Sequence, residues 1–224
     1  YFQLEGFAYR LVPIRRETPD NERINFGNVA ADIMYNNLMN EFKWGNMNDP
    51  KVYIDENNAR MMTNIRNNFN RLAQQLVAEG MSVDSLSSGQ VELPVQEQRI
   101  IDEDKIEKAV KVIERGFELV PTRVIPHEFF SLDMINTLYQ AGATEKARAK
   151  ANEAFNAFED MLGYLFSLSP RFRNSGDVND EMQRNLFYLQ KLERIASAAG
   201  DEETAKKAGD TLEEYYNRFM SGTQ

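Results

Sequence analysis

Two short segments of this chain share the same order of turn and helix signals. Residues 140–147 read Gln-Ala-Gly-Ala-Thr-Glu-Lys-Ala, and residues 198–205 read Ala-Ala-Gly-Asp-Glu-Glu-Thr-Ala. In both, a Gly stands where a helix ends in a left-handed turn, acidic residues follow in the first turn of the next helix, and a small Ala comes where two helices must approach closely. These signals predict a repeated helix-turn-helix unit. Arrays of such units usually hold partners rather than catalyse reactions.

A third glycine, Gly80, tests this repeat. At matching distances before Gly80, Gly142 and Gly200 the chain carries mostly apolar residues, as packing between paired helices requires. These residues are Phe69, Leu72, Ala73 and Leu76, then Ser131, Met134, Ile135 and Leu138, then Leu189, Leu192, Glu193 and Ala196. Ser131 and Glu193 depart from the pattern. The alignment predicts three helix pairs.

Apolar periodicity and turn residues predict the individual elements. Helices are expected at about residues 30–42, 55–79, 105–120, 127–141, 144–168, 181–199 and 201–220. Near the N-terminus, alternating residues from Phe7 to Val12 predict a short strand, and residues 23–29 could return as a second one. Asn28 is expected to cap the first helix.

Two stretches without a sustained stripe of apolar residues are expected to be loops. The first, 81–104, is rich in Ser, Gly and Gln, and its removal is expected to leave the fold intact because the cost of closing a loop grows slowly with its length. The second is 169–180.

The predicted fold is mainly all-α, with stacked helix pairs in an α–α superhelix. It comprises an N-terminal extended segment plus helix, 1–54, and a helical repeat domain, 55–224, packed as one unit.

Composition excludes several classes of function. The net charge of −9 and the absence of a long Lys/Arg cluster argue against a nucleic-acid partner, because binding phosphates needs a clustered basic surface. The chain contains no Cys, which excludes disulfides, thiol catalysis and thiolate metal sites. No apolar run approaches the roughly 18 residues of a membrane span, and no signal-peptide pattern is present. Because the chain begins at Tyr1 rather than Met, we expect it to be a fragment of a longer protein.

No residue pattern points to catalysis, a metal or a cofactor. His127 is the single His, and a capping or surface role is expected for it. The acidic run from Asp177 to Glu181 lacks the spacing and the Gly of a calcium loop. Phosphate-binding loops and nucleophile elbows are absent. We therefore expect this chain itself to be non-catalytic, with no metal and no cofactor.

The helical pattern resembles the tetratricopeptide repeat. Phe69, Leu72, Ala73, Leu76, Gly80, Ala109 and Pro121 match its motif if residues 81–104 are inserted between two helices, whereas Gly142 with Ala147 and Gly200 with Ala205 match only its turn. The resemblance implies that the first helix of each pair lines a concave groove. The groove residues would be Asn67, Asn70, Gln74, Phe129, Asn136, Tyr139, Phe187, Gln190 and Arg194. Their amides could bond a peptide backbone and their aromatic rings could supply apolar contacts, while a merely solvated surface is the equal alternative.

The N-terminal segments 6–13, 32–39 and 42–46 carry a second resemblance. They are similar to the soluble C-terminal region of a bacterial polytopic membrane-protein family related to protein O-mannosyltransferases. This implies membrane spans and catalytic acids upstream of Tyr1, a membrane-tethered domain on the periplasmic side, and a protein or peptide partner. The alternative is a free-standing solute- or glycan-binding helical protein at the cell surface, with an aromatic-lined pocket around Trp44 or Tyr139. A third possibility, an enzyme in its own right, would require carboxylates clustered in a cleft.

Overall fold

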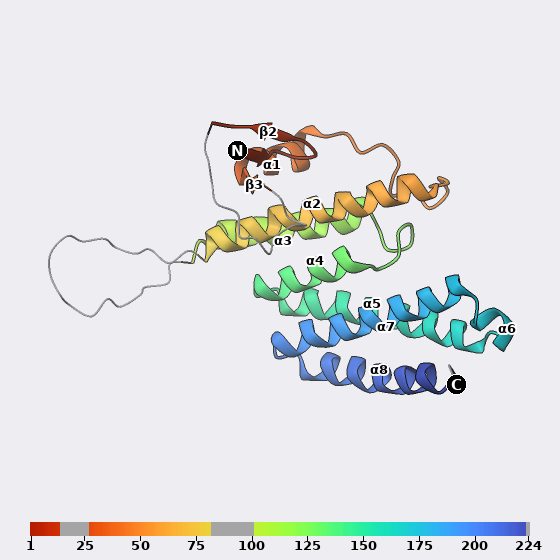
Figure 1. The fold of residues 1–224 in the computed structure, drawn as a ribbon. Helices are drawn as coiled ribbons and strands as arrows, with labels where there is room; N and C mark the ends of the chain where they lie inside the picture. The colour runs from red at the N-terminus through yellow and green to blue at the C-terminus, as the bar shows by residue number, and fades with distance from the viewer. Residues whose placement is uncertain (14–26, 82–100, 223–224) are drawn as a thin grey trace, which may run out of the picture. The chain divides into compact units, whose positions relative to one another are not determined.

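A computed structural model describes residues 1–13, 27–81 and 101–222. Within these ranges the chain is mainly helical, with eight α-helices, one π-helix and a short three-stranded sheet (Figure 1), which confirms the predicted all-α class. It divides into two compact units, Tyr1–Val124 and Ile125–Gln224, so the division does not fall at the expected boundary after residue 54. Most of the expected 81–104 loop and the start of the expected second strand lie outside the described residues.

The first unit opens with a small sheet. Its strands are β1 (Phe2–Leu4), β2 (Tyr9–Leu11) and β3 (Asn28–Val29), in the order β2-β1-β3. β1 pairs antiparallel with β2, with Leu4 opposite Tyr9, and parallel with β3. The strand predicted from the alternation between Phe7 and Val12 contains β2, whereas β1 was not predicted. Between them Gly6 has a φ of 154°, and a Cβ there would lie 2.9 Å from the Phe42 ring, so the turn requires glycine.

The helix expected at 30–42 has two parts. α1 spans Ala31–Asn36 and continues as the π-helix η1, Asn37–Glu41. The expected cap at Asn28 is wrong: Asn28 belongs to β3, and Ala30 occupies the cap position without a side-chain bond. At the start of η1, the Asn37 side chain donates a hydrogen bond of 2.6 Å to the Glu5 carbonyl oxygen, which ties this helix to the sheet.

α2 (Glu56–Gly80) and α3 (Glu103–Leu119) form the first helix pair. Asp55 and Asp102 cap them by accepting backbone N–H bonds from the first turns. The left-handed turn expected at Gly80 is wrong. Gly80 is the last residue of α2, and its φ is not positive. A Cβ at Gly80 would lie 2.9 Å from Ile106 and 3.2 Å from the Asp102 carbonyl oxygen, so this glycine lets α3 approach closely.

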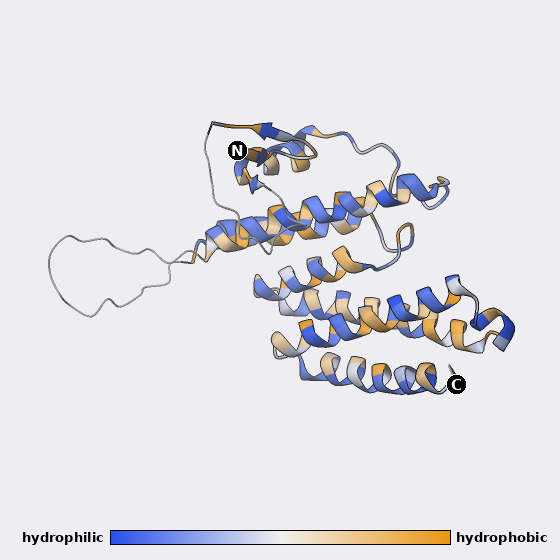
Figure 2. Ribbon diagram, in the orientation of Figure 1, coloured by the Kyte–Doolittle hydropathy of each residue, from blue (hydrophilic) through white to orange (hydrophobic). Residues whose placement is uncertain are grey.

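The second unit contains two further helix pairs. They are α4 (Phe129–Gln140) with α5 (Thr144–Ser167), and α7 (Gly176–Ala198) with α8 (Glu202–Gly222). Gly142 and Gly200 both have a φ of 73°, which confirms the predicted left-handed turns. α7 packs against α4, α5 and α8, and α5 presents a row of fully buried alanines, Ala147, Ala151 and Ala154. Figure 2 shows that each long helix mixes apolar and polar residues, as helices with one buried face do.

The loop expected at 169–180 is wrong in extent. It contains the short helix α6, Pro170–Arg173, and α7 begins at Gly176 instead of near residue 181. Pro170 occupies the first helical turn of α6, where its missing N–H costs nothing. The first turns of α7 are polar and partly exposed, so no apolar stripe marks them in the sequence. None of the described helices is long and apolar enough to cross a membrane.

Candidate partner-binding face

Helices α4 and α7 contact each other in the second unit and present a shared surface. We define this α4–α7 face by Phe129, Asp133, Asn136, Phe187, Gln190, Lys191 and Arg194. Leu132, Leu138, Leu189 and Leu192 are buried beneath it, which fixes the rotation of both helices. Residues one or two turns apart on a helix share a face, so Phe129 aligns with Asn136 and Phe187 with Arg194.

An aromatic stack with a lysine forms the centre of this face. The rings of Phe129 and Phe187 are nearly parallel, with centroids 6.4 Å apart, and Phe187 is 48% exposed. The Lys191 ammonium lies 3.0 Å from the centroid of the Phe129 ring and 2.7 Å from Asp133 Oδ1. Burial lowers the pKa of Lys191, and Asp133 opposes this effect. The face therefore offers an exposed aromatic ring that its neighbours hold in place.

Polar predicted residues flank this centre. Gln190 and Arg194 are exposed and Asn136 is half-buried. The sequence reasoning missed Asp133 and Lys191, although both lie four residues after a predicted member, Phe129 and Phe187 respectively. That i,i+4 spacing is the signal that could have found them.

Three of the other predicted groove residues lie on α2. Asn67, Asn70 and Gln74 belong to the first unit. Asn67 and Gln74 are half-buried, but Asn70 is only 2% exposed and is therefore not an open groove position. A polar side chain at a predicted groove position can be buried by neighbouring residues that the helical register does not reveal.

Tyr139 has a structural partner. Its hydroxyl donates a hydrogen bond of 2.7 Å to Asp201 Oδ2, which also accepts from Arg148 Nε at 3.0 Å and from the Thr204 hydroxyl at 3.1 Å. Burial and the Asp201 carboxylate raise the pKa of Tyr139. Burial alone would raise the pKa of Asp201, but the bonds from Tyr139, Arg148 and Thr204 outweigh it and hold that pKa below its ordinary value. This network joins the two helix pairs of the second unit.

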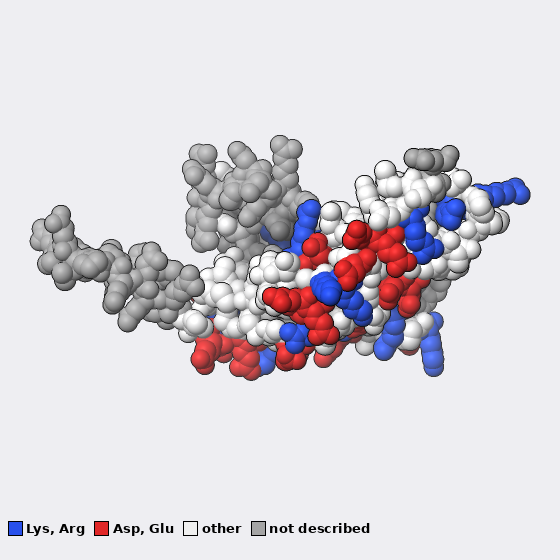
Figure 3. Space-filling view, turned by 90° about the horizontal axis from the view of Figure 1, so that it is seen from below, with Lys and Arg blue, Asp and Glu red and all other residues white. Residues whose placement is uncertain are grey.

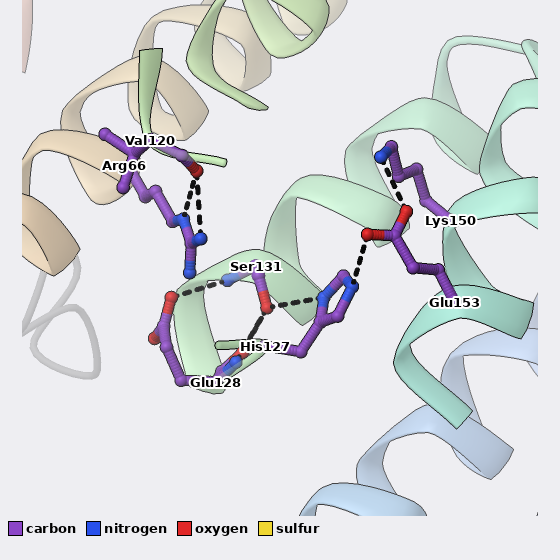
Figure 4. A network of polar contacts seen from close by, with 7 residues as sticks. All are labelled: Arg66, Val120, His127, Glu128, Ser131, Lys150 and Glu153. Atoms are coloured by element: carbon purple, nitrogen blue, oxygen red, sulfur yellow. Dashed lines mark hydrogen bonds and ion pairs between the residues drawn. The ribbon is translucent and has the colours of Figure 1, made fainter. Parts of the chain in front are cut away.

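His127 belongs to the cap of α4, not to the surface (Figure 4). Glu128 accepts N–H bonds from Phe130 and Ser131, and the Ser131 hydroxyl oxygen accepts the Glu128 N–H at 2.8 Å, which completes a capping box. Buried His127 places Nδ1 3.2 Å from Ser131 Oγ and Nε2 3.6 Å from Glu153 Oε1.

This Ser–His–Glu arrangement superficially matches a nucleophile, base and acid. However, Ser131 is fully buried, and its hydroxyl donates to the Glu128 carbonyl oxygen at 2.7 Å. A nucleophile must be accessible to substrate and hydrogen-bonded to its base. The geometry therefore identifies a helix cap. In the described ranges, no group of three His, Asp or Glu side chains is placed to hold a metal ion.

A pocket of about 400 Å³ lies beside the N-terminal sheet. It is lined by Glu5, Phe7, Ala8, Tyr9, Arg10, Asn37 and Phe42. Phe7 and Phe42 stack with centroids 5.4 Å apart, and both contact Trp44. Arg10 pairs with Glu5 at 3.0 Å, so the charges of this pocket balance.

Comparisons with protein-family profiles, with curated proteins and with solved structures gave no match.

Proposed function

We propose that this chain is a non-catalytic protein-interaction domain whose protein or peptide partner binds on the α4–α7 face. The observation that carries the proposal is the exposed Phe187 ring, held by its stack on Phe129. Protein interfaces are enriched in aromatic residues, Phe included, and in Arg. Phe187 and Arg194 supply this chemistry about two turns apart on the same face of α7.

The polar residues around the stack support a peptide as the ligand. Gln190 and Asn136 carry amides that can both donate to and accept from a peptide backbone. Lys191 is already paired with Asp133, so the centre of the face has little net charge to offer. A peptide with one apolar anchor side chain and an exposed backbone fits this combination. The same proposal includes a tetratricopeptide-like arrangement of the helix pairs.

We further propose that the chain is the soluble tail of a membrane-embedded, glycosyltransferase-like protein, tethered on the periplasmic side. The support is the resemblance of segments 6–13, 32–39 and 42–46, which supply β2, α1 with η1, and the start of the segment after η1. The reading frame upstream of Tyr1 is expected to encode several apolar segments of roughly 20 residues each. A frame that begins close to Tyr1, or lacks such segments, would exclude the membrane tail.

The alternative, binding of a solute or glycan, is favoured by the pocket beside the N-terminal sheet. Exposed aromatic rings flanked by a balanced Glu5–Arg10 pair suit a neutral ligand with an apolar face and several hydroxyl groups. This site and the α4–α7 face use different residues, so one experiment can separate them.

That experiment selects peptides from a displayed library on the full chain and probes the same chain on a glycan array. The affinity of the selected peptides is expected to fall by about tenfold or more for Phe187→Ala and to stay unchanged for Phe42→Ala. Tyr216→Ala, which removes an aromatic ring on α8 that is 51% exposed, controls for general loss of apolar surface. Glycan binding that Phe42→Ala abolishes and Phe187→Ala preserves would establish the alternative. Selected peptides that bind Phe187→Ala normally would overturn the α4–α7 assignment.

A further inference from the structure

Arginines gather at one end of the second unit. A pocket of about 410 Å³ there is lined by Phe166 of α5, Arg173 of α6, and Asn217, Arg218 and Ser221 of α8. A smaller pocket shares Phe166, Arg173 and Arg218. Neither lining includes an Asp or Glu, although the chain has a net charge of −9. Figure 3 shows acidic side chains over the middle of the face on which α8 lies, and several Lys and Arg side chains toward its right-hand end.

The Arg218 guanidinium lies over two aromatic rings. Its guanidinium carbon lies 4.9 Å from the centroid of Phe166 and 5.1 Å from that of Tyr215. Both rings are nearly buried and contact each other, with centroids 5.4 Å apart. Stacking fixes the plane of a guanidinium and leaves its N–H groups directed outward from the edge of that plane. The N–H groups of the Arg218 guanidinium are therefore held in position to donate hydrogen bonds to a bound acceptor group.

The ion pair that Arg218 already makes with Glu214 would compete only weakly with a bound anion. Glu214 Oε1 lies 3.5 Å from Arg218 Nη1, and the Glu214 side chain is 65% exposed. An exposed pair one helical turn apart contributes little and is easily exchanged. Arg173 reaches the same pocket from α6, a short helix whose position is set by Pro170 and by packing against α7.

We propose that this arginine pocket binds a phosphate group, carried by a small phosphomonoester or by a phosphorylated peptide residue. A phosphate near neutral pH carries close to two negative charges and three strong acceptor oxygens. Two guanidinium groups match both its charge and its geometry through paired N–H bonds, and Asn217 adds an amide donor. The pocket is larger than a phosphate alone, which leaves room for the attached group. This site is independent of the α4–α7 face.

Isothermal titration of the full chain at constant ionic strength tests the proposal. The probes are inorganic phosphate, a phosphoserine peptide, its unphosphorylated form and acetate. Arg218→Gln and Arg173→Gln are each expected to weaken binding of the two phosphate probes by about tenfold or more. Arg218→Lys retains the charge but loses the stacked fork, so binding is expected to weaken here too. Arg184→Gln, an exposed arginine of α7 paired with Glu181, is the matched control and should bind normally.

Each outcome of the titrations supports or overturns the phosphate proposal. If Arg184→Gln weakens binding as much as the pocket variants, the attraction is unspecific; if acetate or the unphosphorylated peptide binds as well as the phosphate probes, the site is not selective for phosphate. Either result, or the absence of phosphate binding, overturns the proposal. Circular dichroism checks that Arg218→Gln folds, and Arg173→Gln serves alone if it does not. A phosphopeptide that binds much more tightly than inorganic phosphate would identify the peptide as the source of the group.

Discussion

Replacing Leu138 by alanine is expected to lower the free energy of unfolding by about 2–5 kcal/mol, because it leaves a cavity beneath the α4–α7 face. Leu138 is 2% exposed and sits in the last turn of α4, where it contributes to the core of the second unit. Leu72→Ala is expected to cost a similar amount in the first unit, since Leu72 on α2 has no exposed surface. Urea titrations followed by far-ultraviolet circular dichroism measure both changes. The single Trp, Trp44, contacts Phe69 on α2 and adds a fluorescence signal for Leu72→Ala.

Two surface variants make this prediction specific. Asn136→Ala and Arg194→Ala lie on the same two helices as buried leucines but face outward, so each should change stability by no more than about 0.5 kcal/mol. A register error of one residue would turn each set of side chains toward another face of its helix. Stability losses of several kcal/mol for Arg194→Ala, or a negligible loss for Leu138→Ala, would show that the assigned faces are wrong.

Asp201→Ala is expected to destabilise the second unit by about 2–4 kcal/mol. The substitution removes the cap that accepts the Thr204 N–H and leaves the half-buried Tyr139 hydroxyl without its acceptor. Asp201→Asn retains much of the capping capacity and should cost less. Glu202→Gln, next in the chain and exposed at the start of α8, is the control and is expected to cost less than about 0.5 kcal/mol. Equal losses for Asp201→Ala and Glu202→Gln would refute a structural role for the network.

The pH dependence of the Asp201 variants follows from the lowered pKa of this carboxyl. A group whose pKa is lower in the folded state stabilises the fold above its unfolded pKa, and that contribution disappears as the pH falls through the folded pKa. The stability difference between the natural chain and Asp201→Ala should therefore be constant near neutral pH. It should shrink once the pH drops below the ordinary value of 3.8. A difference that persists unchanged in strong acid would mean that the charge of Asp201 contributes nothing.

The sequence alone determined the existence of the long helices, their apolar stripes and two of the turns between them. Phe69, Leu72, Leu138 and Leu192 are buried as the periodicity predicted, and Gly142 and Gly200 adopt the predicted left-handed turns. These features depend on a few neighbouring residues, through helical spacing and the steric freedom of glycine. The stack of Phe129 on Phe187, by contrast, depends on the contact between α4 and α7.

Only the tertiary structure decided which polar residues serve the fold and which remain available to a ligand. Tyr139 matched a groove position, yet its hydroxyl bonds Asp201, 62 residues away, and Gly80 matched a turn, yet it makes room for Ile106 of α3. Arg218 could be recognised as a preorganised donor only after the ends of α5 and α8 had come together around Phe166 and Tyr215. The physical reason is that local patterns report the face on which a side chain lies. Its hydrogen bonds, stacking and charge depend on segments that are distant in the chain and that meet only through packing.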